Sequence, residues 1–131
     1  MSVGKSATPL GRVEGLGSAR EGGGHWLRER VTSVALLLLG TWLIASLLLL
    51  PSLDRRTLAE WLAAPSGAVP MALLVVTSFI HAFDGMKVVV DDYVQDEGNR
   101  FALNTFFYFL AVGGGALALF ALARIAFGAQ G

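Results

Sequence analysis

A histidine, a glycine and an aspartate lie at helical spacing from one another within residues 81–94, which read HAFDGMKVVVDDYV. Four residues share one stripe of a helix, each within about 40° of His81 at about 100° per residue: His81, Gly85, Val88 and Asp92. On such a stripe the imidazole can ligate a metal, and the glycine leaves space for a flat macrocycle or a neighbouring helix. His81 could instead hydrogen-bond to a serine or a carbonyl of a neighbouring helix, and the helix alone does not decide between these interpretations.

This segment ends one of three apolar runs. Of the 131 residues, 54% are hydrophobic and 15% are charged, and the apolar runs cover residues 31–50, 69–90 and 101–123. A bilayer core of roughly 30 Å needs about 20 helical residues. The sequence therefore predicts an all-α membrane protein with three transmembrane helices, at about residues 31–50, 69–93 and 101–127. With Tyr93 at the membrane boundary, His81 would lie about 18 Å below it, near the middle of the bilayer.

Other polar side chains of this helix have structural explanations. Asp84 is expected to pair with Lys87, and we favour this ion pair over a proton relay because the lysine supplies an immediate partner. Lys87 would extend towards the headgroups and could also meet Asp91. Tyr93 lies about 120° from His81. By itself it would anchor the helix at the interface, where its hydroxyl could also meet a ligand that enters from the membrane edge.

The chain is predicted to have two parts: a flexible cytoplasmic N-terminal tail, residues 1–29, and a three-helix membrane domain, residues 30–127. The tail is rich in Gly, Ser and Arg and lacks the apolar region of a cleavable signal peptide. Its acidic residues argue against a mitochondrial transit peptide and favour a bacterial inner membrane. Seven of the ten basic residues lie in the tail or near the second loop, so the positive-inside rule predicts that both face the cytoplasm.

Two segments are predicted to have packing roles. The first loop, Pro51–Ala68, places Leu58, Trp61 and Leu62 at helical spacing beside charges. This pattern indicates a short interfacial helix with Trp61 as an anchor at headgroup level. Gly113–Gly115 in the third apolar run is expected to let another helix pack closely, because small residues allow membrane helices to approach each other.

Charge and cysteine content exclude several kinds of site. The formal net charge is zero and no basic stripe is interleaved with aromatic residues, so we expect no nucleic-acid partner. The chain contains no cysteine, and therefore no disulfide, no thiolate nucleophile and no cysteine-ligated zinc or iron–sulfur cluster of its own. Any redox centre must be held by other ligands, of which histidine is the obvious one.

The pattern H-x3-G-M-x5-D-Y-V, from His81 to Val94, resembles the second-helix signature of the small hydrophobic membrane-anchor subunit of bacterial succinate dehydrogenase. The segment RVTSVAL, Arg30 to Leu36, resembles the start of that family's first helix. The resemblance covers about residues 25–127. The sequence departs from the family's pattern at Asp84, where an uncharged residue is expected.

This resemblance implies a role for four residues. His81 would be an axial ligand of the iron of haem b, and Arg30 would lie near the haem propionates. Tyr93 would hydrogen-bond to ubiquinone, with Asp92 in a supporting role. It also implies partners: a second membrane-anchor (cytochrome b) subunit, an iron–sulfur subunit and a flavoprotein subunit, which the anchor tethers to the membrane.

The only other histidine, His25, precedes the first apolar run, so the second axial ligand is expected from a partner chain. The chain lacks a flavin-binding fingerprint, so it would be a subunit of the dehydrogenase that is not catalytic alone. Two alternatives stay open: a purely structural anchor without haem, and a subunit of another quinone-linked enzyme such as fumarate reductase. A transporter is disfavoured because the chain has no paired broken helices.

Overall fold

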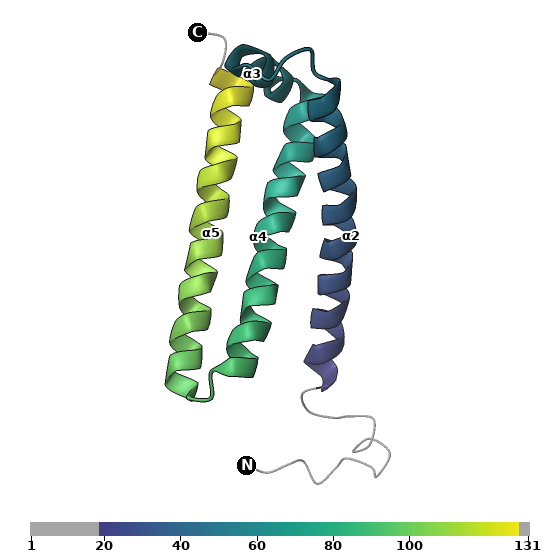
Figure 1. Cartoon of the computed structure of the whole chain (residues 1–131). Coiled ribbons are helices and arrows are strands. Elements are labelled where there is room, and N and C mark those ends of the chain that lie inside the picture. Colours follow the sequence, from purple (N-terminus) through teal and green to yellow (C-terminus); the bar gives the residue numbers. More distant parts are fainter. Residues whose placement is uncertain (1–18, 129–131) are drawn as a thin grey trace.

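A computed structural model of the chain describes residues 19–128, with side chains from residue 23 onwards. This part consists of four helices and no strand: α2 (Ala19–Leu49), α3 (Arg55–Ala63), α4 (Pro65–Tyr93) and α5 (Glu97–Gly128). The three long helices run side by side with α4 in the middle, and the short α3 lies across one end (Figure 1). We call this end the α3 end, and the opposite end, which carries the α4–α5 turn, the turn end. The predicted all-α architecture is confirmed.

Three helices are long and apolar enough to cross a membrane: Gly23–Leu49, Pro65–Tyr93 and Glu97–Gly128. They contain 27, 29 and 32 residues, whereas about 20 would span the hydrocarbon core. Each helix therefore extends beyond the core into the headgroup region or tilts within the bilayer. The three predicted spans are confirmed, although α4 and α5 each begin four residues earlier than expected, at Pro65 and Glu97.

The first long helix begins well before its predicted start near residue 30. Residues 19–29, which were predicted to belong to a flexible tail, form the first turns of α2. The Gly-rich sequence disfavours a helix here, but two contacts made by these turns compensate: Arg28 binds Asp84 of α4, and His25 lies beside Glu29 one turn further on. Residues 1–18 of the predicted tail lie outside the described residues.

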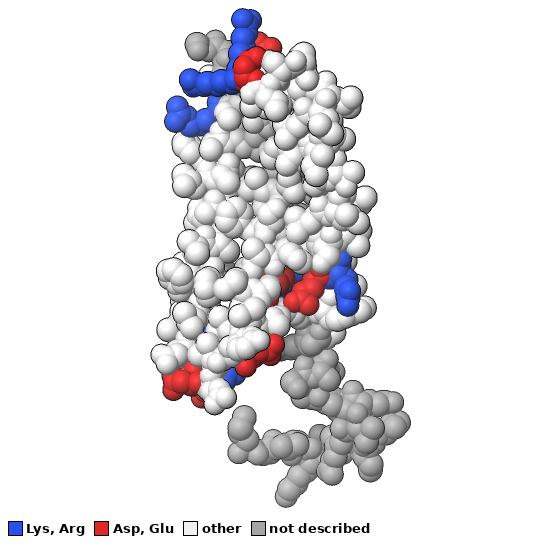
Figure 2. Space-filling model, viewed as in Figure 1, with Lys and Arg blue, Asp and Glu red and all other residues white. Residues whose placement is uncertain are grey.

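The chain has almost no hydrophobic core of its own. Between residues 23 and 128, Val90 and Leu122 are the buried apolar side chains, whereas Leu49 is 85% exposed. Charged side chains gather towards the two ends of the molecule, and the surface between them is uncharged (Figure 2). Lipid chains are as apolar as leucine, so they or partner chains, rather than this chain itself, must cover most of that surface.

Specific contacts hold the helices together. On α5, a Cβ atom added to Gly114 would lie 2.8 Å from the ring of Phe79 in α4, so the glycine permits this close approach. The prediction that a helix packs against Gly113–Gly115 is thereby confirmed for Gly114 and Gly115, while Gly113 has nothing within 4 Å. In the described part of the chain, the backbones of α2 and α5 do not approach within 8 Å between Cα atoms, whereas both pack against α4.

The short helix predicted in the first loop is present as α3, whose first turn is capped by Asp54. The Asp54 carboxylate accepts hydrogen bonds from the Ser52 hydroxyl and from the Thr57 backbone N–H, and both bonds lower its pKa. Trp61 stacks on Trp42 of α2, with ring centroids 5.6 Å apart. The tryptophan expected to anchor the loop in the headgroups therefore also ties α3 to the first membrane helix.

Candidate functional site

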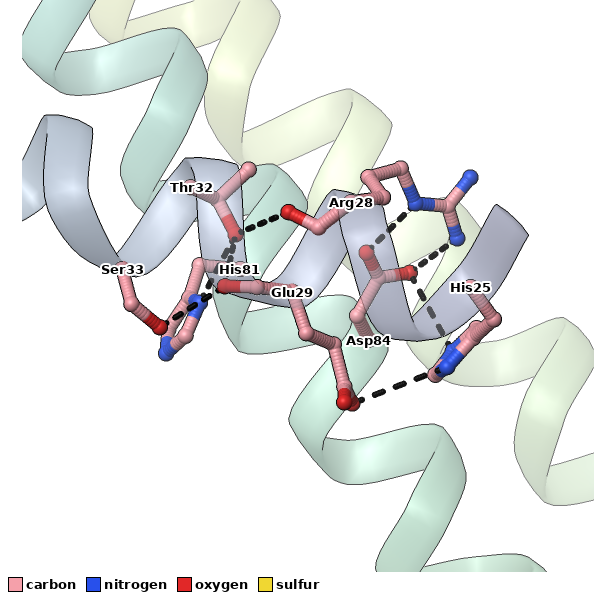
Figure 3. Close-up of polar contacts among 7 residues, drawn as sticks. All are labelled: His25, Arg28, Glu29, Thr32, Ser33, His81 and Asp84. Atoms are coloured by element: carbon pink, nitrogen blue, oxygen red, sulfur yellow. Dashed lines mark hydrogen bonds and ion pairs between the residues drawn. The ribbon is translucent and has the colours of Figure 1, made fainter. Parts of the chain in front are cut away.

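His81 lies on α4 and contacts the first turns of α2. Its Nδ1 atom is 3.0 Å from the hydroxyl oxygen of Thr32, a buried side chain of α2 (Figure 3). The imidazole is half-buried. The hydrogen bond to a neighbouring helix, which the sequence left open as an explanation for His81, is thus present, and it uses only one of the two ring nitrogens.

The surroundings of Thr32 favour one assignment of the proton on the His81 ring. The threonine hydroxyl is 2.9 Å from the carbonyl oxygen of Arg28 and 3.1 Å from that of Glu29. A carbonyl oxygen can only accept, so the single hydroxyl proton is donated to the α2 backbone. The hydroxyl oxygen is then best placed to accept a hydrogen bond from Nδ1–H of His81. In the neutral ring this tautomer leaves Nε2 with a free lone pair, the form in which imidazole binds a metal.

The face of α4 beside His81 is open. Gly85, one turn along the helix, is exposed, and a Cβ atom added there would have nothing within 4 Å. In the described residues, no group of three or more His, Cys, Asp or Glu side chains converges as a metal site. His81 would therefore be a single ligand from this chain, and the remaining ligands of any metal would come from outside it.

Asp84 makes the second polar link between α2 and α4. Its carboxylate is buried, with 1% exposure, and it accepts two hydrogen bonds from Arg28: one from Nε at 2.7 Å and one from Nη2. Nε2 of His25 lies 3.9 Å from the same carboxylate and has no hydrogen-bond partner among the described residues. These contacts are visible in Figure 3, where the arginine and the histidine approach Asp84 from α2.

The predicted pairing of Asp84 with Lys87 is therefore wrong. The aspartate faces α2, and the early start of α2 brings Arg28 to its level. Guanidinium and carboxylate match in a two-bond geometry that a lysine cannot provide. From the sequence, Arg28 was expected in the tail and Thr32 had no predicted role, although their spacing of four residues puts both on one side of a helix.

The two links occupy neighbouring turns of the same interface. Arg28 and Thr32 are four residues apart on α2, and Asp84 and His81 are three residues apart on α4, in the order that antiparallel helices require. Together they fix the register of the two helices and the rotation of α4. The orientation of the His81 ring consequently depends on a buried ion pair one turn away.

The structure does not bring the other predicted site residues to His81. Arg30 lies about 160° from Thr32 around α2, and its guanidinium stacks over Trp26 at 5.4 Å from the ring centroid. Asp92 and Tyr93 form the exposed end of α4, with Tyr93 83% exposed. Asp92 shares the stripe of His81, about 16 Å further along the helix axis. The predicted role of Arg30 at haem propionates stays a prediction.

These observations define the class of protein: a three-span helical membrane subunit whose polar interface presents one imidazole to an open face. Residues 4–123 match the family described as succinate dehydrogenase/fumarate reductase transmembrane subunit, and the chain belongs to this family. The predicted resemblance is confirmed.

The relatives include several proteins named succinate dehydrogenase hydrophobic membrane anchor subunit. The protein from Paracoccus denitrificans is 34% identical over 93% of this chain and 94% of its own length. The protein from Rickettsia conorii is 38% identical over 64% of this chain and 68% of its own, and that from Rickettsia bellii is 35% identical over 64% and 67%. No solved structure matches the chain.

The chain is thus a membrane-anchor subunit of a succinate dehydrogenase, with a role in an oxidoreductase complex. Its three apolar helices fit a multi-pass protein of the bacterial inner membrane, as predicted.

The ion pair between Arg28 and Asp84 leads to a first prediction. Arg28→Gln leaves a buried carboxylate without its partner and should destabilise the assembled complex by about 3–5 kcal/mol. Asp84→Asn should cost less, because Arg28 is 52% exposed and can turn towards the headgroups. In a double-mutant cycle followed by thermal denaturation, the double variant should lose less than the sum of the single losses.

Lys87→Gln provides the control for this cycle, because it tests the pairing that the structure contradicts. In the delipidated complex it should change stability by no more than about 0.5 kcal/mol. A large loss with Lys87→Gln, together with additive effects of the Arg28 and Asp84 substitutions, would contradict the assignment of the ion pair.

Proposed function

We propose that this subunit, together with a second membrane-anchor (cytochrome b) subunit, holds a haem b and a ubiquinone-reduction site, and tethers the iron–sulfur and flavoprotein subunits of succinate dehydrogenase to the bacterial inner membrane. The observation that carries the proposal is the hydrogen bond between Nδ1 of His81 and the hydroxyl of Thr32. It leaves Nε2 free on an open face of α4. Bound haem would supply a one-electron carrier at this position.

The residues around His81 fit a single axial imidazole. A hydrogen bond to the nitrogen remote from the metal is the usual support for a metal-binding histidine, because it fixes the tautomer and the ring orientation. Gly85 leaves the surface next to the ring without a side chain, so a flat macrocycle could approach the helix backbone. The fit therefore includes both the donor atom and the space beside it.

The second axial ligand would come from the partner anchor subunit. His25 is the only other histidine, and its ring is directed to Asp84 and Glu29 rather than towards His81. The open face of α4 beside His81 would accordingly be the surface that packs against the second anchor subunit. Such packing would cover Val88, which shares the stripe of His81 and is exposed in this chain alone.

Ubiquinone would bind near the exposed end of α4. Tyr93 can donate its hydroxyl proton in a hydrogen bond to a quinone oxygen, and this bond strengthens as negative charge develops on that oxygen during reduction. Asp92 precedes it and would support the site by holding or passing a proton. With the N-terminus and the turn end in the cytoplasm, as the positive-inside rule indicates, protons would arrive from that side.

Electrons would reach this site from an iron–sulfur subunit bound at the turn end, because the chain has no cysteine to hold a cluster. Succinate oxidation itself would take place in the flavoprotein, so this subunit is not catalytic alone. The family description also names fumarate reductase, and a corresponding role in that enzyme is the alternative. Co-purification with a flavoprotein that oxidises succinate in the host membrane would distinguish the two.

A second prediction tests His81 as the haem ligand. In the complex with His81→Ala, the reduced-minus-oxidised absorption spectrum should lose the signal of low-spin haem b, because one axial ligand is missing. His25→Ala is the matched control and should keep the signal. An unchanged spectrum with His81→Ala would mean that the subunit contributes no ligand through this residue and would favour a purely structural anchor.

A third prediction concerns Thr32, which we assign as a positioning residue for His81. Thr32→Val keeps the shape of the side chain but removes the acceptor for Nδ1–H. The haem should be retained, while its reduction potential should rise by about 20–60 mV, which corresponds to one hydrogen bond of about 0.5–1.4 kcal/mol. Thr32→Ser restores a hydroxyl and should restore the potential in a redox titration. If valine and serine give equal potentials, the hydrogen bond has no such role.

A fourth prediction concerns Tyr93. Tyr93→Phe should lower succinate-to-quinone activity by about 100-fold, the usual effect of removing a hydrogen-bond donor to a developing oxyanion. Succinate-to-dye activity, which bypasses the quinone site, should not change. Tyr108→Phe removes the only other phenol and is the control. Equal loss in both variants, or no loss with Tyr93→Phe, would exclude the proposed role.

A further inference from the structure

A second polar site lies on the other side of α4. An open groove of about 580 Å³ separates α4 from α5 at the turn end. Its lining contains two cations, Lys87 and Arg100, one carboxylate, Glu97, and the amide of Asn104. None of the roles proposed so far for this chain uses these four side chains.

Two side chains that line the groove each hold a buried polar atom without a hydrogen-bond partner among the described residues. One is Nε of Arg100, whose Nη2 donates to the backbone oxygen of Gln95 at 3.3 Å. The other is Oδ1 of Asn104, whose Nδ2 donates to Asp91 at 3.1 Å. A small rotation of each side chain would bring to the groove one unused donor beside a positive charge and one unused acceptor. Buried polar atoms of this kind are normally satisfied, so both indicate a missing partner.

The charges narrow the chemistry of that partner. Lys87 and Arg100 form no ion pair with the described residues, and the lining, which includes Glu97, carries one net positive charge. The carboxylate of Asp91, which accepts a hydrogen bond from Asn104, is a further negative charge in contact with this lining. A phosphodiester carries one negative charge and accepts from Arg100 Nε–H. A hydroxyl group can donate to Asn104 Oδ1 and to the Glu97 carboxylate. The two requirements are met by a phosphodiester whose headgroup carries hydroxyls.

The position of the groove matches the headgroup region of a bilayer. Lys87 lies about 9 Å from the end of α4, and Arg100 about 5 Å from the start of α5. Further from the turn end, the lining becomes aromatic, with Phe83, Tyr108 and Phe109. The rings of Phe83 and Tyr108 meet edge to face at 5.7 Å between centroids. A phosphate beside the cations could therefore continue into an acyl chain over the aromatic wall.

The groove also lies away from the surface assigned to the partner subunit. Around α4, Lys87 is about 160° from Gly85, the residue that opens the face beside His81. If the face beside His81 packs against the second anchor subunit, which rests on the proposed function, the groove side of α4 and α5 points away from that subunit and towards lipid. Basic pockets between membrane helices on the cytoplasmic side are known to bind anionic headgroups.

We propose that the groove between α4 and α5 is a binding site for one anionic phospholipid of the phosphatidylglycerol type. Lys87 and Arg100 hold the phosphate, Asn104 and Glu97 accept from the headgroup hydroxyls, and the aromatic side chains contact an acyl chain. The site fastens the turn end of α4 and α5 to the cytoplasmic leaflet without using the His81 face.

Native mass spectrometry of the purified, delipidated complex tests the proposal through the dissociation constant of the first bound lipid. Wild-type complex should bind phosphatidylglycerol more tightly than phosphatidylcholine. The double variant Lys87→Gln, Arg100→Gln should bind it about 25-fold more weakly, at about fivefold for each cation. Arg55→Gln, Arg124→Gln removes the same charge at the α3 end and should leave this constant unchanged.

Phosphatidylmethanol, a phosphodiester without headgroup hydroxyls, tests the role of Asn104. Wild-type complex should prefer phosphatidylglycerol to phosphatidylmethanol, and Asn104→Leu should remove this preference. Three outcomes would each overturn the proposal. The double variants at the two ends could weaken phosphatidylglycerol binding equally, or the wild-type complex could bind phosphatidylcholine as tightly as phosphatidylglycerol. The third outcome is an unchanged dissociation constant in the groove variants. Loss of the iron–sulfur subunit from the groove variants with unchanged lipid affinity would instead identify a protein as the occupant.

The haem spectrum of the same samples separates this proposal from the proposed function. Lys87 and Arg100 lie away from His81, so the groove variants should keep the wild-type haem signal. Weaker lipid binding with a normal spectrum supports the groove assignment by itself. A spectrum without haem in the wild-type complex would reject the proposed haem site, while the lipid measurements would still decide on the groove.

Discussion

The buried carboxylate of Asp84 is the constraint on which the arrangement of the helices depends. In a medium without water, an unpaired carboxylate is too costly to keep, so α2 must continue as a helix far enough to place Arg28 beside it. Once this pair has formed, the next turn of α2 brings Thr32 to His81. The ion pair between Arg28 and Asp84 therefore also positions the hydrogen bond between Thr32 and His81. That bond in turn decides which nitrogen of the imidazole stays free.

The rest of the chain contributes little to fixing this geometry. Apolar contacts between membrane helices gain little over contacts with lipid, so polar links and close backbone approaches decide how the helices pack. Arg28 and Thr32 of α2 contact one side of α4. Gly114 of α5 lies against Phe79 on another side of α4. Because few side chains are buried within the chain, the three long helices keep large apolar surfaces that a partner subunit can cover. A site shared with a second subunit is consistent with this arrangement.

The sequence predicted those features that depend on local pattern. Apolar runs of sufficient length identified the three spans, the amphipathic spacing around Trp61 identified α3, and the small residues around Gly114 identified a close contact. The partner of Asp84 was missed because it lies 56 residues away in the chain, and periodicity within one helix carries no information about the facing helix. The start of α2 was missed for the same reason: three consecutive glycines oppose a helix locally, whereas the contact of Arg28 with α4 favours it.

The rotation of α4 gives its two exposed sides different chemistry. Gly85 and Lys87 are separated by only one residue, yet they point in nearly opposite directions, and each would be misplaced on the other side. A lysine beside His81 would place a cation where a flat ligand or a helix must approach, and a glycine in the groove would remove one of its two cations. Because Asp84 lies between His81 and Gly85 in the sequence and faces α2, its pairing with Arg28 excludes any rotation that would exchange these sides. The buried carboxylate of Asp84 thus determines the direction in which the neighbouring side chains of α4 point.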